Sequence, residues 1–216
     1  MKRPVIFIAF ICLASAAAAQ QDRPFEKEIQ AFEQQDRKES PLKGGILFTG
    51  SSSIRMWNDL EERFPGYNFI QRGFGGSQLS DVTHYARRIV LPYRPSKIFL
   101  YAGDNDIAAG QSADEIYAEF LEFHKLISDS LPAATVYYIA AKPSPSRQRL
   151  MPVYKEFNDK VASFIRKQSC NWEFVDVYSA MLDENGQPVA ALFTEDMLHM
   201  NSKGYDIWEK LISPFL

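Results

Sequence analysis

The chain has 216 residues, a formal net charge of -3 and 46% hydrophobic residues. This length suits one domain with one substantial core, and the apolar content excludes an intrinsically disordered chain. The sequence contains no basic block, so nothing in its charge supports a nucleic-acid partner.

The first residues have the pattern of a secretory signal peptide. A positively charged head is followed by an apolar run, Val5–Leu13, and by a tract of small residues, Ser15–Ala19. The apolar run is shorter than the span of about 20 residues that a membrane helix needs. We therefore expect a signal peptide over residues 1–19 and an exported protein, periplasmic or secreted, with no stable membrane anchor. An uncleaved anchor is the alternative.

Cleavage of that peptide would leave Cys170 as the only cysteine. An intramolecular disulfide is then impossible, even in an oxidising compartment. We expect Cys170 to be a small, partly buried hydrophobic residue.

Residues 20–41 are polar and charged, and residues 42–216 have the composition of the folded domain. Within the first segment Phe25, Ile29 and Phe32 fall at helical spacing. This spacing predicts a helical extension packed on the outside of the domain.

The domain alternates between strand and helix patterns. Apolar runs rich in β-forming residues predict five strands, at Ile46–Thr49, Tyr67–Arg72, Lys97–Ala102, Thr135–Ala140 and Glu173–Tyr178. Helical spacing predicts helices at Ile54–Leu60, Leu79–Leu91, Ile116–Leu131, Val153–Ile165 and Tyr205–Ile212. Strands that alternate with helices predict an α/β fold, in which a parallel five-stranded sheet carries helices on both faces.

Four polar or glycine-rich pieces lie where a site would form in such a sheet. Three of them follow the first three strands, and the fourth precedes the last helix: Gly50–Ser52, Gly73–Gly76, Gly103–Asn105 and Asp196–His199. Each piece alone has an ordinary explanation, as a turn, a helix cap or a solvated pair. Ligands in α/β sheets bind at the carboxyl ends of the strands, so the four pieces together predict a shared site.

In this order the four pieces resemble the SGNH (GDSL-like) hydrolase family, across nearly all of the domain. The resemblance implies a flavodoxin-like, three-layer α/β/α fold and activity on esters or thioesters without a cofactor. It aligns the nucleophile with Ser52, with Ser51 and Ser53 as competitors. The usual first block reads Gly-Asp-Ser, whereas this chain has a serine at position 51. The resemblance further implies an oxyanion hole made by the N–H groups of Ser52 and Gly76 and the side-chain amide of Asn105.

The chemistry explains why these residue types are needed. A serine hydroxyl becomes a good nucleophile only when a base takes its proton. His199 can accept that proton and return it to the leaving group, and Asp196 can fix the tautomer of the imidazole through its other nitrogen. Gly76 suits an oxyanion hole because no side chain blocks the approach of a substrate to its N–H group.

Other titratable residues compete for these roles. Asp81 and His84 repeat the Asp-x-x-His spacing, and we interpret them as a first-turn carboxylate and a helix-surface residue. His124 lies on an apolar helix stripe and is interpreted as a core or boundary histidine. Asp104 and Asp106 flank Asn105, but no third acidic ligand stands at a recognisable spacing. We therefore predict no metal site, and we expect Asp106 to hold the backbone around Asn105.

The predicted partner is a small-molecule acyl ester, and its identity stays open among an acetylated sugar, a short acyl ester, a lysophospholipid and a thioester. The loops Pro143–Pro152 and Asp183–Asp196 are expected to form pocket walls. The lack of a long insertion favours short acyl groups. A carbohydrate- or lipid-binding module that has lost catalysis is the alternative, and a flavin-binding protein on the same sheet order is a third hypothesis.

Overall fold

The computed structural model describes residues 24–168 and 171–216. The predicted signal peptide and Cys170 lie outside the described residues. In the part that is described, no helix is long and apolar enough to cross a membrane.

One parallel sheet forms the centre of the fold. Its strands are β1 (Ile46–Gly50), β2 (Phe69–Gly73), β3 (Lys97–Tyr101), β4 (Thr135–Ile139) and β5 (Trp172–Val175). They lie in the order β2-β1-β3-β4-β5, so the chain reverses its direction across the sheet between β1 and β3. The predicted parallel sheet is confirmed, and the reversal lies between β1 and β3, where α/β sheets bind ligands at the carboxyl ends of their strands.

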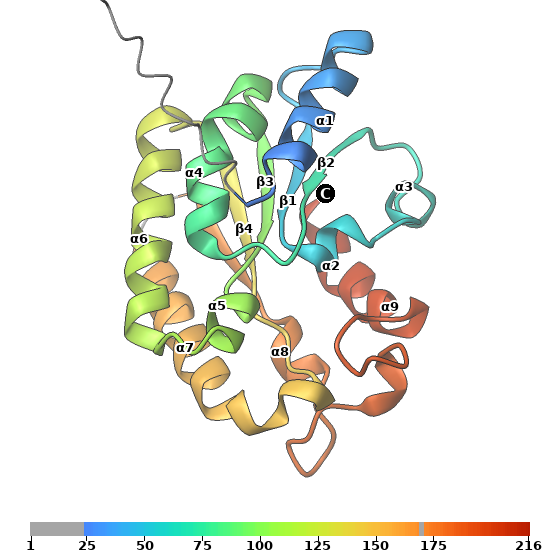
Figure 1. The fold of residues 1–216 in the computed structure, drawn as a ribbon, viewed down its shortest axis with the longest axis vertical. Coiled ribbons are helices and arrows are strands. Elements are labelled where there is room, and N and C mark those ends of the chain that lie inside the picture. Colours follow the sequence, from blue (N-terminus) through green and yellow to red (C-terminus); the bar gives the residue numbers. More distant parts are fainter. Residues whose placement is uncertain (1–23, 169–170) are drawn as a thin grey trace, which may run out of the picture.

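Helices cover both faces of this sheet and make the predicted three layers. The helices are α1 (Glu26–Lys38), α2 (Ser52–Arg55), α3 (Leu60–Arg63), α4 (Leu79–Ile89), α5 (Asp104–Ala108), α6 (Ala113–Ser130), α7 (Met151–Lys167), α8 (Val177–Ala180) and α9 (Ser202–Ile212). Figure 1 shows α4 and α6 on one side of the strands and α2 and α9 on the other. Right-handed crossovers between parallel strands produce this division.

Aromatic side chains fill the space between the layers. On the α9 face, Phe48 and Phe99 stack at 4.6 Å, and the ring of Trp57 packs against that of Trp208 at 5.7 Å. On the opposite face, Tyr138 of β4 meets the ring of Phe120 of α6 at 5.3 Å. The central strands β1, β3 and β4 are largely apolar, as expected for strands that are buried on both faces.

The prediction of a helix running from Ile54 to Leu60 is wrong. Helix α2 ends at Arg55, and α3 starts only at Leu60. The side chain of Gln71 on β2 donates hydrogen bonds to the carbonyls of Ile54, at 2.5 Å, and Trp57, at 3.1 Å. These bonds satisfy carbonyls that a longer helix would have used, and they turn Trp57 into the core.

A further predicted boundary is also wrong. Strand β5 ends at Val175 rather than Tyr178, because the Asp176 carboxylate accepts a hydrogen bond from Ser179 N–H at 2.9 Å and starts α8.

Helix α4 begins at Leu79, as predicted, and is preceded by Gln78. Its first turn is closed by Asp81, which accepts the N–H of Gln78 at 2.9 Å.

Helix α1 is tied to the domain by ion pairs. The guanidinium of Arg72, on β2, is nearly buried and pairs with Asp36, which also accepts a hydrogen bond from Tyr93 Oη at 2.5 Å. Arg88 of α4 pairs with Glu26 at 2.8 Å and Glu33 at 2.7 Å. The extension is therefore fastened to both β2 and α4.

Candidate active site

Ser52 lies where β1 turns into α2 at the carboxyl edge of the sheet. Gly50 makes this turn with a φ of 123°, and a Cβ there would stand 1.9 Å from the carbonyl oxygen of Tyr101 on β3. Only a glycine lets the two strands approach so closely. The turn puts Ser52 at the first position of α2, where the residue is 8% exposed.

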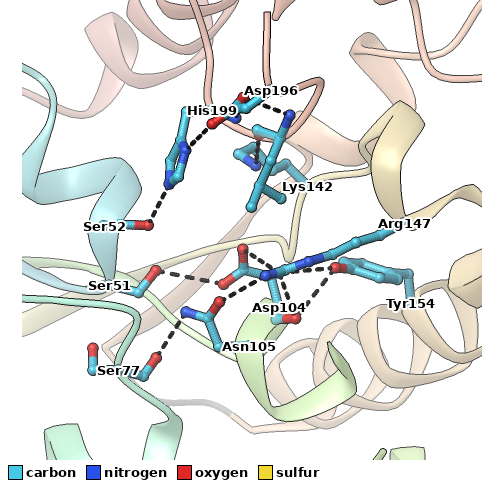
Figure 2. Close-up of polar contacts among 11 residues, drawn as sticks. Ser51, Ser52, Ser77, Asp104, Asn105, Lys142, Arg147, Tyr154, Asp196 and His199 are labelled. Carbon is cyan, nitrogen blue, oxygen red and sulfur yellow. Dashed lines mark hydrogen bonds and ion pairs between the residues drawn. The ribbon is translucent and has the colours of Figure 1, made fainter. Parts of the chain in front are cut away.

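Three residues from distant parts of the chain meet at Ser52. Its Oγ lies 3.0 Å from Nε2 of His199, and Nδ1 of His199 lies 2.6 Å from Oδ2 of Asp196 (Figure 2). The Asp196 carboxylate can only accept at this contact, so Nδ1 carries the proton and Nε2 is left to accept one. The geometry is that of a hydroxyl, a base and an orienting carboxylate in line.

The turn from Asp196 to His199 is held by the carboxylate itself. Oδ1 of Asp196 accepts the backbone N–H groups of Leu198 and His199, both at 2.9 Å, and the hydroxyl of Thr194 at 2.8 Å. Burial raises the pKa of Asp196, but the hydrogen bonds from His199, Leu198 and Thr194 outweigh it and hold the pKa below its ordinary value. Asp196 therefore stays ionised at neutral pH.

The structure separates Ser52 from its two neighbours. Ser51 is buried, and its hydroxyl lies 3.4 Å from Oδ1 of Asp104. Ser53 is also buried, and its Oγ has no hydrogen-bond partner among the described residues. Of the three serines, Ser52 is the one whose hydroxyl meets His199.

The predicted oxyanion-hole residues lie near one another. A Cβ built on Gly76 would stand 3.8 Å from Nδ2 of Asn105. Asn105 is in the first turn of α5, and one hydrogen of its amide is donated to the carbonyl of Ser77 at 3.1 Å. The second hydrogen has no acceptor in residues 24–168 and 171–216, so the amide can bind an incoming oxygen.

Sequence reasoning missed Arg147, although it placed Pro143–Pro152 at the site. The guanidinium donates to Oδ1 of Asn105 at 3.0 Å and to the carbonyl of Asp104 at 2.8 Å. Burial lowers the pKa of Arg147, but the Asp104 carboxylate, 3.2 Å away, and the hydroxyls of Tyr154 and Tyr101 together outweigh burial and raise it. The only available signal was an arginine in a proline-rich loop after a strand.

Lys142, also missed, is a buried amine at the same edge. It follows β4, is 1% exposed, and its Nζ donates to the carbonyl of Leu198 at 2.8 Å. That carbonyl lies inside the turn between Asp196 and His199. Burial lowers the pKa of Lys142 to about 8.

Replacing Lys142 with methionine is expected to change how stability depends on pH. The unfolded chain keeps the lysine proton up to pH 10.5, whereas the folded chain releases it near pH 8. Between these pH values the unfolded state therefore binds more protons than the folded state, so the free energy of unfolding of the wild type should rise with pH. We expect this rise to exceed that of Lys142→Met by on the order of 3 kcal/mol. Urea unfolding from pH 7.5 to 10.5 measures this difference, with the exposed Lys155→Met as the control. Parallel curves for wild type and Lys142→Met would contradict it.

Helix α1 reaches the glycine loop after β2. The carboxylate of Glu28 accepts the N–H of Gly75 at 3.0 Å, and the ring of Phe25 meets that of Phe74 at 5.4 Å. The sequence predicted only a helix packed on the outside of the domain. The contacts show that α1 fixes the backbone directly before Gly76.

The competing residues lie apart from these contacts. Asp81 closes the first turn of α4, as predicted, and His84 is exposed on the same helix beside the ring of Tyr85. His124 packs against the rings of Phe164 and Trp172, at 4.9 and 4.7 Å, as expected for a boundary histidine.

Asp106 does not bond the backbone around Asn105 in the way we expected. Its Oδ1 accepts the N–H of Leu79 at 2.9 Å and so holds the start of α4. Burial raises the pKa of Asp106 to about 7. Within the described residues, no group of three or more His, Cys, Asp or Glu side chains is placed to hold a metal ion.

A cavity of about 660 Å³ lies elsewhere, between α7 and β5, where Trp172, Phe174 and Tyr178 line it. Its lining includes none of Ser52, Asn105, Asp196 and His199. The arrangement of reactive groups, rather than cavity size, therefore locates the candidate site at the ends of β1 and β3.

Comparison with known proteins agrees with this architecture. The sheet and its flanking helices have the SGNH/GDSL α/β fold. A sequence model of the GDSL-like Lipase/Acylhydrolase family matches residues 46–207, and the chain belongs to this family, whose members are hydrolases acting on esters. No curated protein matches the chain.

Solved structures share the fold at low sequence identity. A protein from Streptococcus pneumoniae, provisionally described as a platelet activating factor, is 22% identical with a TM-score of 0.75, over 88% of this chain and 91% of that one. A GDSL-like lipase from Bacteroides thetaiotaomicron is 19% identical with a TM-score of 0.73, over 87% and 96%. An acetylxylan esterase from Geobacillus stearothermophilus, solved as a catalytic mutant, is 14% identical with a TM-score of 0.63, over 81% and 94%.

Proposed function

We propose that this protein is an exported serine esterase that hydrolyses short acyl esters. Ser52 is the nucleophile, His199 the general base and acid, and Asp196 the residue that orients His199. The observation that carries the proposal is the pair of contacts, 3.0 Å from Ser52 Oγ to His199 Nε2 and 2.6 Å from His199 Nδ1 to Asp196. Export rests on the pattern of residues 1–19, and the mass of the mature protein tests it.

The first half-reaction acylates the enzyme. Nε2 of His199 takes the hydroxyl proton of Ser52 as the oxygen attacks the ester carbonyl. The resulting oxyanion accepts hydrogen bonds from the N–H groups of Ser52 and Gly76 and from Asn105 Nδ2. His199 then gives the proton to the alcohol oxygen, which leaves as the carbon–oxygen bond breaks.

The second half-reaction releases the acid. His199 takes a proton from water, and the hydroxide formed attacks the acyl-enzyme carbonyl. The same donors hold the second oxyanion, and the proton returns to Ser52 as the ester bond to the enzyme breaks. The ionised Asp196 stabilises the imidazolium that forms in both halves.

An acetyl or similarly short acyl ester is the substrate that we favour. The acetylxylan esterase that shares the fold acts on acetyl esters by its description. The side chains of Asp196 and His199 are 48% and 22% exposed, so the side of the site that carries the base faces solvent. The contacts among Ser52, His199 and Asp196 support an active esterase over a catalytically inactive binding module.

A fluorophosphonate probe and a series of p-nitrophenyl esters test the proposal together. We expect the probe to label Ser52, identified by peptide mass spectrometry, because only an activated serine reacts. We expect kcat/KM to be highest for acetate and to fall as the acyl chain lengthens to octanoate. A protein that is neither labelled nor active on any of the esters would overturn the proposal, and a preference for octanoate would overturn its acyl-chain part.

A further inference from the structure

We propose that Arg147 is a positioning residue that fixes the side-chain amide of Asn105 for binding the oxyanion. This inference rests on the proposed function, because it assigns Arg147 a role in the oxyanion hole of that same site. Arg147 itself acts through Asn105 and needs no contact with the substrate.

The amide of Asn105 is held at both of its ends. Its oxygen accepts a hydrogen bond from Nη2 of Arg147 at 3.0 Å, and its nitrogen donates one to the carbonyl of Ser77 at 3.1 Å. An asparagine amide can rotate by half a turn, which exchanges its oxygen and nitrogen. A cationic donor at the oxygen opposes that rotation, so Nδ2 stays turned toward the carbonyl of Ser77 (Figure 2).

The guanidinium is itself fixed by a second set of bonds. Nη1 donates to the carbonyl and the carboxylate of Asp104, at 2.8 and 3.2 Å, and Tyr154 Oη donates to the same carbonyl at 3.2 Å. The side chain of Arg147 is 16% exposed and that of Asp104 is 4% exposed. Because the planar guanidinium of Arg147 is already paired and nearly buried, it loses little further conformational freedom when it bonds Asn105.

This arrangement also changes the donor strength of the amide. A positive charge at the amide oxygen polarises the group and makes its N–H bonds stronger donors. The carboxylate of Asp104 balances the charge of Arg147, so the pair adds no net positive charge that would bind the substrate in its ground state. The expected contribution of Arg147 is therefore to kcat rather than to KM.

The same segment also contacts the turn that carries His199. The N–H of Ser146 donates to the carbonyl of Met197 at 3.0 Å, one residue before Arg147 reaches Asn105. The stretch from Ser146 to Arg147 thus joins the side of the site that holds the base to the side that holds the oxyanion. Because this stretch lies between the two sides, the side chain of Arg147 can bond Asn105 in the first turn of α5.

A double-mutant cycle tests the proposal. On p-nitrophenyl acetate we expect Arg147→Gln to lower kcat by about 10-fold to 100-fold with KM nearly unchanged, less than the loss from removing an oxyanion donor outright. In the Asn105→Ala background the same substitution should cost less than about 3-fold, because its target is gone. Arg149→Gln, an exposed arginine two residues away, is the matched control and should change neither constant. Losses from Arg147→Gln and Asn105→Ala that simply multiply would overturn the proposal.

A second measurement does not depend on catalysis. In protein labelled with ¹⁵N-asparagine, the side-chain amide signals of Asn105 are assigned by their disappearance in Asn105→Ala. They should shift or broaden in Arg147→Gln and stay in place in Arg149→Gln. Unchanged signals would overturn the role of Arg147 even in an active enzyme, whereas a protein that is inactive and unlabelled by fluorophosphonate would overturn the proposed function alone.

Arg147→Lys covers the case in which Arg147→Gln does not fold. Lysine keeps a positive charge beside Asp104 but lacks the fork that reaches Asp104 and Asn105 together. We expect it to retain the thermal stability of the wild type and to show the same loss of kcat and the same shift of the Asn105 signals. Wild-type kcat in a stable Arg147→Lys protein would show that the charge alone suffices and would overturn the positioning role.

Discussion

Replacing Ser52 with alanine is expected to lower kcat on p-nitrophenyl acetate by roughly 10⁴-fold or more, which leaves only the contribution of binding and of the oxyanion donors. The reason is that, among residues 24–168 and 171–216, only the hydroxyl of Ser52 lies against Nε2 of His199, 3.0 Å away. The substitution removes a single oxygen, so the melting temperature should change little. Steady-state kinetics and thermal unfolding measure the two effects.

Ser51→Ala and Ser53→Ala are the matched controls for this prediction. Ser51 lies 3.4 Å from the carboxylate of Asp104, and Ser53 is buried without a partner among the described residues. Both variants should keep most of the turnover. Full activity in Ser52→Ala would contradict the assignment of Ser52 as the nucleophile. A loss of activity in Ser51→Ala as large as the loss expected for Ser52→Ala would contradict it as well.

Asn105→Ala is expected to lower kcat by about 10²-fold to 10³-fold, because one donor to the oxyanion is lost. The amide stabilises charge that develops only in the transition state, so KM should stay within about 3-fold of the wild type. Asn105 also bonds the carbonyl of Ser77 at 3.1 Å, so a small fall in melting temperature is expected as well. Michaelis–Menten kinetics on p-nitrophenyl acetate give both constants.

Asn105→Asp separates the donor from the shape of the side chain. Aspartate keeps the size of asparagine but places an acceptor with negative charge where the oxyanion forms, so kcat should fall at least as far as in the alanine variant. Variants that raise KM while leaving kcat intact would mean that Asn105 binds the ground state of the substrate and is not an oxyanion donor.

The sheet could be predicted because its strands are buried on both faces. Runs such as Lys97–Ala102 and Thr135–Ala140 are apolar after their first residue, a pattern typical of strands in a parallel sheet. Element ends were less predictable, since they depend on contacts from far along the chain. Gln71 of β2 ends α2, and no pattern around Ile54 announces that contact.

The residues of the site were predictable for the opposite reason. Ser52, Gly76, Asn105, Asp196 and His199 belong to short pieces whose order along the chain is informative. The residues that hold these side chains in place were not predictable, because arginine, lysine and glutamate side chains have many structural roles in proteins. Arg147, Lys142 and Glu28 acquire a role only once the fold sets them against Asn105, Leu198 and Gly75. The choice among Ser51, Ser52 and Ser53 likewise needed the direction in which α2 leaves the sheet.

The docking of α1 has a consequence for where the working unit of this protein begins. The family match starts at residue 46, after α1 has ended at Lys38. A shortened version starting at that boundary would lack Asp36, the ion-pair partner of Arg72, and Phe32, whose ring covers the Arg72 guanidinium. It would also lose the carboxylate that steadies Gly75, one residue before an N–H that we assign to the reaction. The minimal functional unit therefore extends upstream of the segment that matches the family, far enough to include α1 and Phe25, whose ring packs against Phe74.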